Sequence, residues 1–225
     1  MSNAPMDPLA VMLTTKDLKK SLAFYRDVLG FRVESAWPSE AEPMWANVVM
    51  GRQSVMLGQD MPPQAIEKAC SHDPAKAAIM KQRHEEFGKN KPGTGVYVYV
   101  AVDDVDARVV RVAGKVAKKP AKPESQFYGI RDYEVEDPDG YHLMVYTPIR
   151  MESCQSCAMP LKDAKPGEMY CSYCVDEQGR LRPYETVLEG TVSGYFMGMQ
   201  KMPRPQAEKA AREHLAKMPA WRGRK

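Results

Sequence analysis

Four cysteines in the C-terminal part of the chain have the spacing of a metal site. They form two Cys-x-x-Cys pairs, Cys154 with Cys157 and Cys171 with Cys174, separated by thirteen residues. Two residues between cysteines let both thiolates of one turn point at the same ion, and two such turns supply four sulfur ligands. Because four thiolates leave no place for water on the ion, the pattern predicts one structural zinc per chain.

The same cysteines allow two other readings, a pair of disulfides or a redox-active Cys-x-x-Cys. The first residues, MSNAPMDPLA, lack the basic and apolar stretches of a secretory signal, and no run of apolar residues is long enough to span a membrane. We therefore predict a cytoplasmic location, where thiols stay reduced. The doubled pair disfavours a redox role, so zinc is the preferred interpretation.

No other set of residues with catalytic chemistry can be assembled from the sequence. The single remaining cysteine, Cys70, stands apart, and no Ser/His/Asp or Cys/His arrangement follows from the histidine positions. The histidines are His72, His84, His142 and His214. We therefore predict no catalytic residues.

Composition divides the chain near residue 150. The 225 residues are 44% hydrophobic and 27% charged, which is typical of a globular protein large enough to bury a core. Eight Lys or Arg and two Glu after residue 200 give the tail a charge of about +6, against about −3 for the rest. The sequence thus favours two domains, over residues 8–148 and 150–225.

The first domain contains the order strand–helix–strand–strand–strand twice. One copy spans about 8–58, with Asp17 as helix N-cap, and the other about 95–148, with Asp104 as N-cap. Asp137-Pro138-Asp139-Gly140 is a tight turn between the last two strands. The predicted strands are 9–15, 31–37, 44–50, 54–58, 96–102, 115–118, 130–136 and 141–147.

Residues 59–94 lie between the two copies and differ from both. Pro62 and Pro63 exclude a strand, and Asp73-Pro74 starts a helix that runs to about Phe87. Two readings are open. The insertion could cover a sheet edge or a cleft, or it could be a solvated linker helix.

Two segments of the first domain carry a family resemblance. Residues 15–31, TKDLKKSLAFYRDVLGF, resemble the opening helix of the vicinal oxygen chelate superfamily, and Tyr128–Arg131 with Asp137–Tyr141 resembles its closing hairpin. That superfamily includes glyoxalase I, extradiol dioxygenases and bleomycin-resistance proteins. The resemblance implies an α+β fold in which paired βαβββ modules curve around a cleft, and it implies a homodimer.

The resemblance also indicates where metal-using members place their ligands. The corresponding positions hold Ala10, Leu57, Tyr97 and Met144, none of which is a normal ligand for a hard or borderline divalent ion. A one-residue slip in strand register restores no His or carboxylate at these positions. The sequence therefore predicts a cleft without a catalytic metal, which disfavours glyoxalase and dioxygenase chemistry.

A metal-free cleft resembles the bleomycin-resistance branch, which binds and sequesters a small molecule. Aromatic walls would favour an apolar, planar or cationic ligand. The candidate cleft residues are Trp45, Tyr97, Tyr99, Tyr128, His142 and Met144. Each has a plainer reading, because the aromatic residues and Met144 could fill the core between the modules, and His142 could be solvated.

A second resemblance concerns the C-terminal domain. Cys154–Leu161, Tyr170–Cys174 and Gly179 look like a zinc ribbon family found in bacterial proteins. Members often end in a helix closed by Leu, Pro or Trp, which here is Ala207–Lys217 followed by Met218–Trp221. Ala158 stands where the family usually has Gly. The resemblance implies a small zinc ribbon with a terminal helix.

Three functions remain open. The preferred one is a small-molecule binding protein with a structural zinc ribbon. The second is a metal-dependent lyase or dioxygenase. The third is a regulator whose ribbon and basic tail contact nucleic acid or a partner protein. Nucleic acid is not favoured, because Glu208 and Glu213 interrupt the basic tail, as on a solvated helix face. No membrane partner is predicted.

Overall fold

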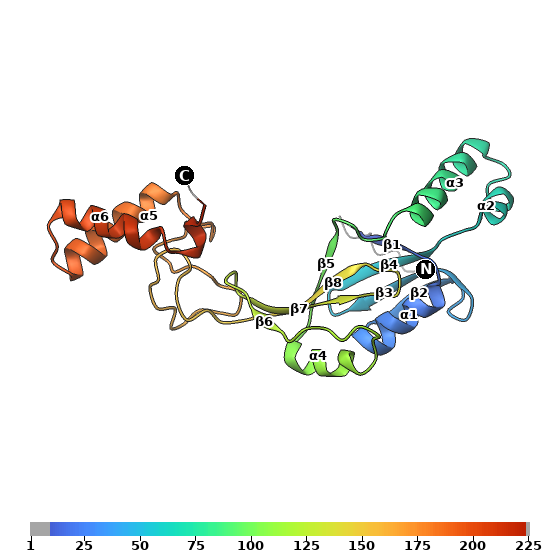
Figure 1. The fold of residues 1–225 in the computed structure, drawn as a ribbon, viewed down its shortest axis with the longest axis horizontal. Helices are drawn as coiled ribbons and strands as arrows, with labels where there is room; N and C mark the ends of the chain where they lie inside the picture. The colour runs from blue at the N-terminus through green and yellow to red at the C-terminus, as the bar shows by residue number, and fades with distance from the viewer. Residues whose placement is uncertain (1–9, 224–225) are drawn as a thin grey trace. The chain divides into compact units, whose positions relative to one another are not determined.

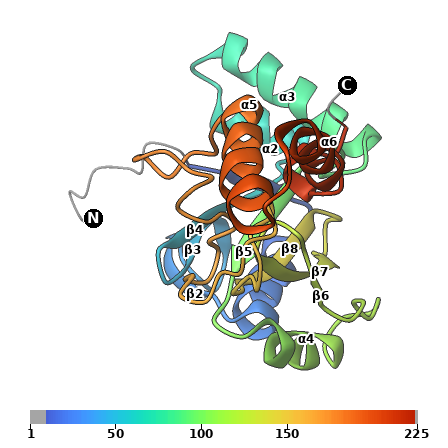
Figure 2. The ribbon, with the colours of Figure 1, turned by 90° about the vertical axis from the view of Figure 1, so that its left-hand side faces the viewer.

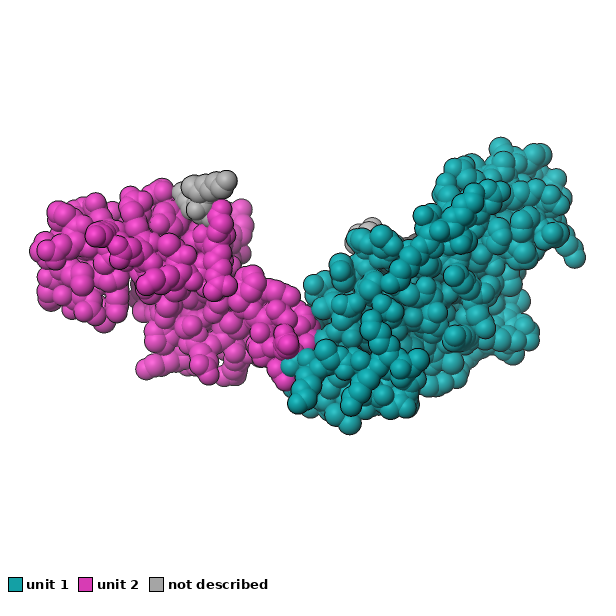
Figure 3. Space-filling view, viewed as in Figure 1, with its two compact units in different colours: residues 1–123, 133–146 teal, residues 124–132, 147–225 magenta. Residues whose placement is uncertain are grey.

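The computed structural model describes residues 10–223, which form two compact units (Figure 3). Unit 1 consists of residues 1–123 and 133–146, and unit 2 of residues 124–132 and 147–225. The division thus falls between residues 146 and 147, and the short segment 124–132, which pairs β6 with β7, also belongs to unit 2. No helix in the described part of the chain is both long and apolar enough to cross a membrane.

The first module of unit 1 follows the predicted order (Figure 1). Its elements are β1 (Met12–Thr15), α1 (Leu18–Ala23), the π-helical turn η1 (Phe24–Leu29), β2 (Arg32–Pro38), β3 (Pro43–Met50) and β4 (Gln53–Gln59). The sheet order is β1-β4-β3-β2, with β1 parallel to β4 and the other pairs antiparallel. Asp17 caps α1 by accepting a hydrogen bond from the Lys20 backbone at 3.1 Å, as predicted.

The second module repeats this arrangement with a shorter edge strand. Its elements are β5 (Tyr97–Ala101), α4 (Val105–Ala113), β6 (Glu124–Ser125), β7 (Ile130–Glu136) and β8 (His142–Pro148). They form a four-stranded sheet in the order β5-β8-β7-β6. The predicted strand at 115–118 is wrong, because those residues form turns and bends. The edge strand begins only after Pro120 and Pro123, whose nitrogens cannot donate to a sheet ladder.

Both sheets bury the face that packs on α1 and α4. Alternation along the strands puts Leu57, Leu143 and Val145 wholly inside this core, whereas Met12, Tyr97 and Tyr99 lie on the opposite face and are exposed. The buried cluster also includes Leu13, Leu18, Tyr25, Val48, Val100 and Val105. One continuous core therefore joins the two modules, and each sheet keeps one open face.

The turn Asp137–Gly140 connects the second sheet to α1. One carboxylate oxygen of Asp137 accepts hydrogen bonds from the backbone N–H groups of Asp139, Gly140 and Tyr141, each at 2.9 Å. Asp139 accepts from the Lys16 backbone at 2.7 Å and from the Ser21 hydroxyl at 2.7 Å. Burial raises the pKa of Asp137, and its three backbone donors oppose that shift. The aspartates of this motif are therefore structural.

The insertion between the modules forms two helices, α2 (Pro63–Ala69) and α3 (Pro74–Lys89). Asp73 caps α3 by accepting from the Lys76 backbone at 3.0 Å, where the sequence predicts its start. A cavity of about 170 Å³ separates α3 from the open face of β1 and β4, and Met12, His84 and Phe87 line it. One side of α3 thus faces the sheet across this cavity, although none of its residues is fully buried.

Unit 2 has a helical part that the sequence analysis only partly predicted. Its elements are α5 (Tyr184–Gly190), the π-helical stretch η2 (Thr191–Met199), α6 (Arg204–Leu215) and the 3₁₀ turn η3 (Pro219–Trp221). The terminal helix was predicted at 207–217, whereas α5 and η2 were missed. Figure 2 shows α5 beside α6, and both helices contribute to the apolar cluster that surrounds the cysteines.

Candidate metal centre and ligand-binding face

The four paired cysteines meet in unit 2. The sulfur atoms of Cys154, Cys157, Cys171 and Cys174 all lie within 4.8 Å of one another. The Cys157 and Cys171 sulfurs are 3.6 Å apart. Sulfurs that share a tetrahedral Zn²⁺ with bonds of about 2.3 Å would be ~3.8 Å apart. The cluster therefore has the size of a four-sulfur metal site.

The backbone shapes each cysteine turn for such a site. The Ala158 N–H donates to the Cys154 carbonyl at 2.8 Å, and the Cys174 N–H donates to the Cys171 carbonyl at 2.9 Å. Ala158 has a φ of 62°, the left-handed region that favours glycine. That conformation is the one a glycine would adopt there without strain, which agrees with the glycine expected from the zinc ribbon resemblance. The Cys171 N–H also donates to the Cys154 sulfur at 3.3 Å, as donors around metal thiolates do.

The electrostatics of the cluster also fit a metal ion. Hydrogen bonds from the Cys157 thiol, and to a smaller extent from the Cys174 thiol, lower the pKa of the Cys154 thiol. The same hydrogen bond to Cys154 raises the pKa of the Cys157 thiol. Cys154, Cys157 and Cys174 therefore share their protons unequally, and a divalent cation would replace those protons. The buried Ser156 hydroxyl finds no hydrogen-bond partner within the described residues, and thiolate ligands beside it would provide acceptors. The donor set fits Zn²⁺.

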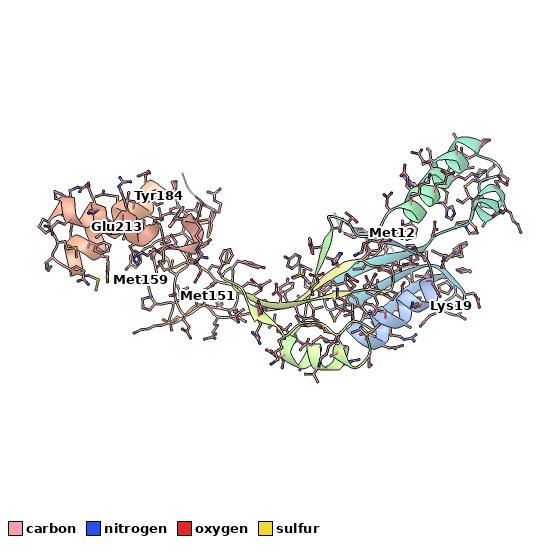
Figure 4. The ribbon with its side chains drawn as sticks, viewed as in Figure 1. Met12, Lys19, Met151, Met159, Tyr184 and Glu213 are labelled. Atoms are coloured by element: carbon pink, nitrogen blue, oxygen red, sulfur yellow. The ribbon has the colours of Figure 1, made fainter. Side chains whose placement is uncertain are left out.

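The terminal helix and its aromatic closure hold the cluster in place. Ala207, Ala211 and Leu215 of α6 are fully buried against it. The Trp221 indole donates to the Ser156 carbonyl at 3.0 Å, and its ring meets the edge of Tyr184 at 5.2 Å. Figure 4 labels Tyr184 in this region. The alanine face of α6 and Trp221 therefore pack onto the cysteine turns.

Four of the six candidate cleft residues lie together on the open face of the second sheet. In the parallel pair of β5 and β8, Tyr97 is opposite His142 and Tyr99 is opposite Met144. The rings of Tyr97 and His142 are 5.6 Å apart, and Tyr99 meets Tyr146 at 6.0 Å. Tyr97 and Tyr99 are 59% and 52% exposed, so they do not fill the core of this chain. Together they form an aromatic surface.

The other two candidates lie elsewhere. Trp45 is on β3 of the first sheet, opposite Trp37 on one side and Gly58 on the other. Tyr128 belongs to unit 2, where its ring packs on Phe127 at 5.1 Å. Among the positions compared with metal ligands, Leu57 is wholly buried and therefore faces the core. Its neighbours Met56 and Gly58 occupy the open side of β4.

A second group of potential ligands was missed in the sequence analysis. Donor atoms of Glu134, Glu136 and His142 lie within 4.8 Å of one another on β7 and β8. His142 is paired with Glu134 through Nδ1, and Lys91 and Lys118 approach Glu136 at 3.7 and 3.6 Å. The signal was present, because Glu134 and Glu136 alternate along one strand face and the turn at 137–140 returns the chain to His142.

A paired βαβββ fold with an open aromatic face defines the class of protein, and comparisons with known proteins supply the family. Residues 8–145 match the Glyoxalase/Bleomycin resistance protein/Dioxygenase superfamily. The chain belongs to this superfamily. Residues 153–222 match a family described as "Putative zinc ribbon domain". The search of curated proteins found no match.

Solved structures with a similar fold come from several bacteria. A glyoxalase/bleomycin resistance protein/dioxygenase from Nocardioides is 19% identical with a TM-score of 0.42, covering 73% of this chain and 91% of that one. TioX from Micromonospora sp. ML1 is 20% identical with a TM-score of 0.44, covering 64% and 98%. TnmS3, an antibiotic binding protein from Streptomyces sp. CB03234, is 19% identical with a TM-score of 0.41, covering 64% and 99%.

Proposed function

We propose that this protein binds a small apolar or aromatic molecule on the open face of its second sheet. The observation that carries the proposal is the surface formed by the exposed Tyr97 and Tyr99 and the partly exposed His142 and Met144, which stands on a sheet above a closed core. Exposed aromatic rings beside a thioether suit a planar or cationic ligand, because ring faces attract both. No catalytic residue is needed for this function.

Two further features belong to this proposal. We infer that the four cysteines hold one zinc ion, which in a closed four-sulfur site would supply structure rather than chemistry. We also infer a homodimer, because the open faces expose large side chains, among them Met12, which Figure 4 labels in unit 1. Reduced thiols are required for the zinc site, so the cytoplasm is the location that suits the protein.

A panel of small aromatic and cationic compounds, screened by thermal shift against the zinc-loaded chain, tests the binding proposal. A compound that raises the melting temperature should lose its effect in Tyr99→Ala. It should keep its effect in Phe127→Ala, which removes a similarly exposed aromatic residue of unit 2 that lies outside the second sheet's aromatic surface. Equal loss in both variants, or no stabilising compound in a broad panel, would contradict binding on the second sheet.

The group of Glu134, Glu136 and His142 favours one alternative, a metal-dependent lyase or dioxygenase. Two carboxylates and an imidazole are ligands that borderline divalent ions accept. Elemental analysis separates the two functions, because the preferred one needs one metal per chain and the alternative two. If the alternative holds, Glu136→Gln removes the second metal and leaves the first, whereas Glu152→Gln, a control outside the group, removes neither.

A further inference from the structure

A cavity in unit 2 borders the four-cysteine cluster. Its volume is about 780 Å³, within the range of about 300–1,000 Å³ that is typical of small-molecule sites. It lies between the two cysteine turns, which contribute Cys157 and Cys174, and the helical stretch formed by α5 and η2. This site is distinct from the open sheet face discussed above, because all of its lining residues belong to unit 2.

Two glycines on the helical side leave space in the cavity. Gly190 and Gly194 are four residues apart and both line it. A Cβ atom built on either glycine would meet nothing within 4 Å. Glycine is less favourable than alanine inside a helix, and close approach of another group is the usual structural reason for keeping it. No group of the described residues makes that approach, so the space over both glycines is available to a bound molecule.

The rim of the cavity is apolar and exposed. Met159 is 43% exposed, Tyr173 is 73% exposed and Tyr195 is 44% exposed, although all three are large side chains that line a concave surface. Figure 4 labels Met159 in unit 2. Aromatic faces and a polarizable thioether pack well against an aromatic or aliphatic body.

Among the described Asp, Glu, Lys and Arg side chains, only a positively charged one lines the cavity. Arg182 is its single arginine or lysine, and none of the described lining residues is a carboxylate. The Arg182 Nε donates to the Val175 carbonyl at 2.8 Å, which fixes the orientation of the guanidinium group. A zinc ion with four thiolates would carry a charge of −2, so an anionic group would be accepted only where Arg182 offsets that charge.

We propose that this cavity binds a small molecule with an aromatic or apolar body and one acidic group that pairs with Arg182. Charge complementarity with Arg182 selects the acidic group, and the Tyr and Met rim selects the body. The proposal does not depend on the function of the sheet face, and either can fail without the other.

Two matched fluorescent probes test the proposal on the zinc-loaded full chain. 8-Anilino-1-naphthalenesulfonate has an aromatic body and one anionic group, and N-phenyl-1-naphthylamine has the same body without the charge. We expect saturable binding of both. Gly194→Leu should fill the cavity and weaken the binding of both probes more than about tenfold, because the aromatic body of each probe would lose its apolar contacts. Gly88→Leu is the control, because that helical glycine also has open space but lies in α3.

Arg182→Gln tests the charge. It should weaken the sulfonate probe about tenfold, the effect of losing one hydrogen-bonded charge pair, and leave the neutral probe unchanged. Arg212→Gln, which removes an exposed arginine of α6 outside the cavity, should change neither. Zinc content and circular dichroism verify the fold of each variant, and Gly190→Leu replaces Gly194→Leu if that variant loses zinc.

Three results would overturn the proposal. The first is that neither probe binds saturably. The second is binding that survives filling of the cavity but is lost in Tyr99→Ala, since the probes would then occupy the open sheet face. The third is an equal effect of Arg182→Gln and Arg212→Gln on the sulfonate probe, which would reduce the role of Arg182 to general surface charge.

Discussion

Removal of the metal should unfold unit 2 and leave unit 1 folded. Structural zinc contributes about 10–16 kcal/mol in small zinc-binding peptides at pH 7, which equals or exceeds the ~5–15 kcal/mol net stability of a typical domain. The core of unit 2 is built around the cysteines themselves, three of which are buried. Without the ion, four thiols at mutual distances within 4.8 Å have no comparable interaction to hold them. Unit 1 has its own core, which contains none of these cysteines.

Trp221 gives a local readout of this unfolding. Its indole donates to the Ser156 carbonyl at 3.0 Å between Cys154 and Cys157, so its emission reports the first cysteine turn. In a chain with Trp37→Phe and Trp45→Phe, a strong zinc chelator should shift the Trp221 emission to the red, and added zinc should reverse the shift. Far-ultraviolet circular dichroism should retain the contribution of unit 1, with a separate thermal transition.

Matched cysteine variants give the control for this experiment. Cys174→Ser should lose the metal and show the red-shifted emission without chelator. Cys70→Ser should keep both metal and emission, because Cys70 is buried in unit 1 near Met80. The reasoning is refuted if the Trp221 emission stays unchanged after elemental analysis shows that the metal has been removed. It is also refuted if the thermal transition of unit 1 disappears with the metal.

Three smaller perturbations test the packing and charges. Leu215→Ala should destabilise unit 2 by about 3–5 kcal/mol, because Leu215 is wholly buried in α6, and chemical denaturation measures the loss. Asp17→Ala should cost about 1 kcal/mol by removing the cap of α1, measured in the same way. Burial raises the pKa of Tyr25 well above its usual value, so the folded state favours the neutral phenol. The stability that the neutral Tyr25 phenol contributes is complete below pH 10, the ordinary pKa of tyrosine, and is lost as the pH rises through the raised pKa of the folded state. Tyr25→Phe should therefore flatten the alkaline decline in unfolding free energy.

Local sequence signals predicted the elements whose cause is itself local. The caps at Asp17 and Asp104 and the turn Asp137–Gly140 each act within a few residues, and all are present in the structure. The strand predicted at 115–118 is wrong, and the helices over 184–199 were missed, for the opposite reason. Val116 gives a strand-like apolar signal, but it packs on the core from a loop. In α5 and η2, three glycines lower the helix propensity and hide the helical pattern.

The candidate sites also differ in whether their arrangement has a local cause in the sequence. The cysteine cluster could be predicted because each Cys-x-x-Cys turn brings its own ligands together, and the chain then only has to join two such turns. The aromatic face could be predicted in part, since Tyr97, Tyr99, His142 and Met144 follow from strand alternation. Trp45 and Tyr128 could not be placed in this way, because their position relative to that face depends on how separate sheets and units assemble.

The group of Glu134, Glu136 and His142 shows how a comparison with family positions can hide chemistry. Three of the four positions compared with metal ligands lie on β4, β5 and β8, and the fourth, Ala10, precedes β1, whereas both glutamates come from β7. Strand alternation alone places Glu134 and Glu136 on the open side, beside the aromatic surface proposed to bind a ligand. Glu136 already lies within ion-pair distance of Lys91 and Lys118, and Glu134 is paired with His142. A metal and a cationic ligand would both have to displace Lys91 and Lys118, which as exposed partners hold Glu136 only weakly, so the number of metal ions per chain decides between the two proposed functions of the second sheet.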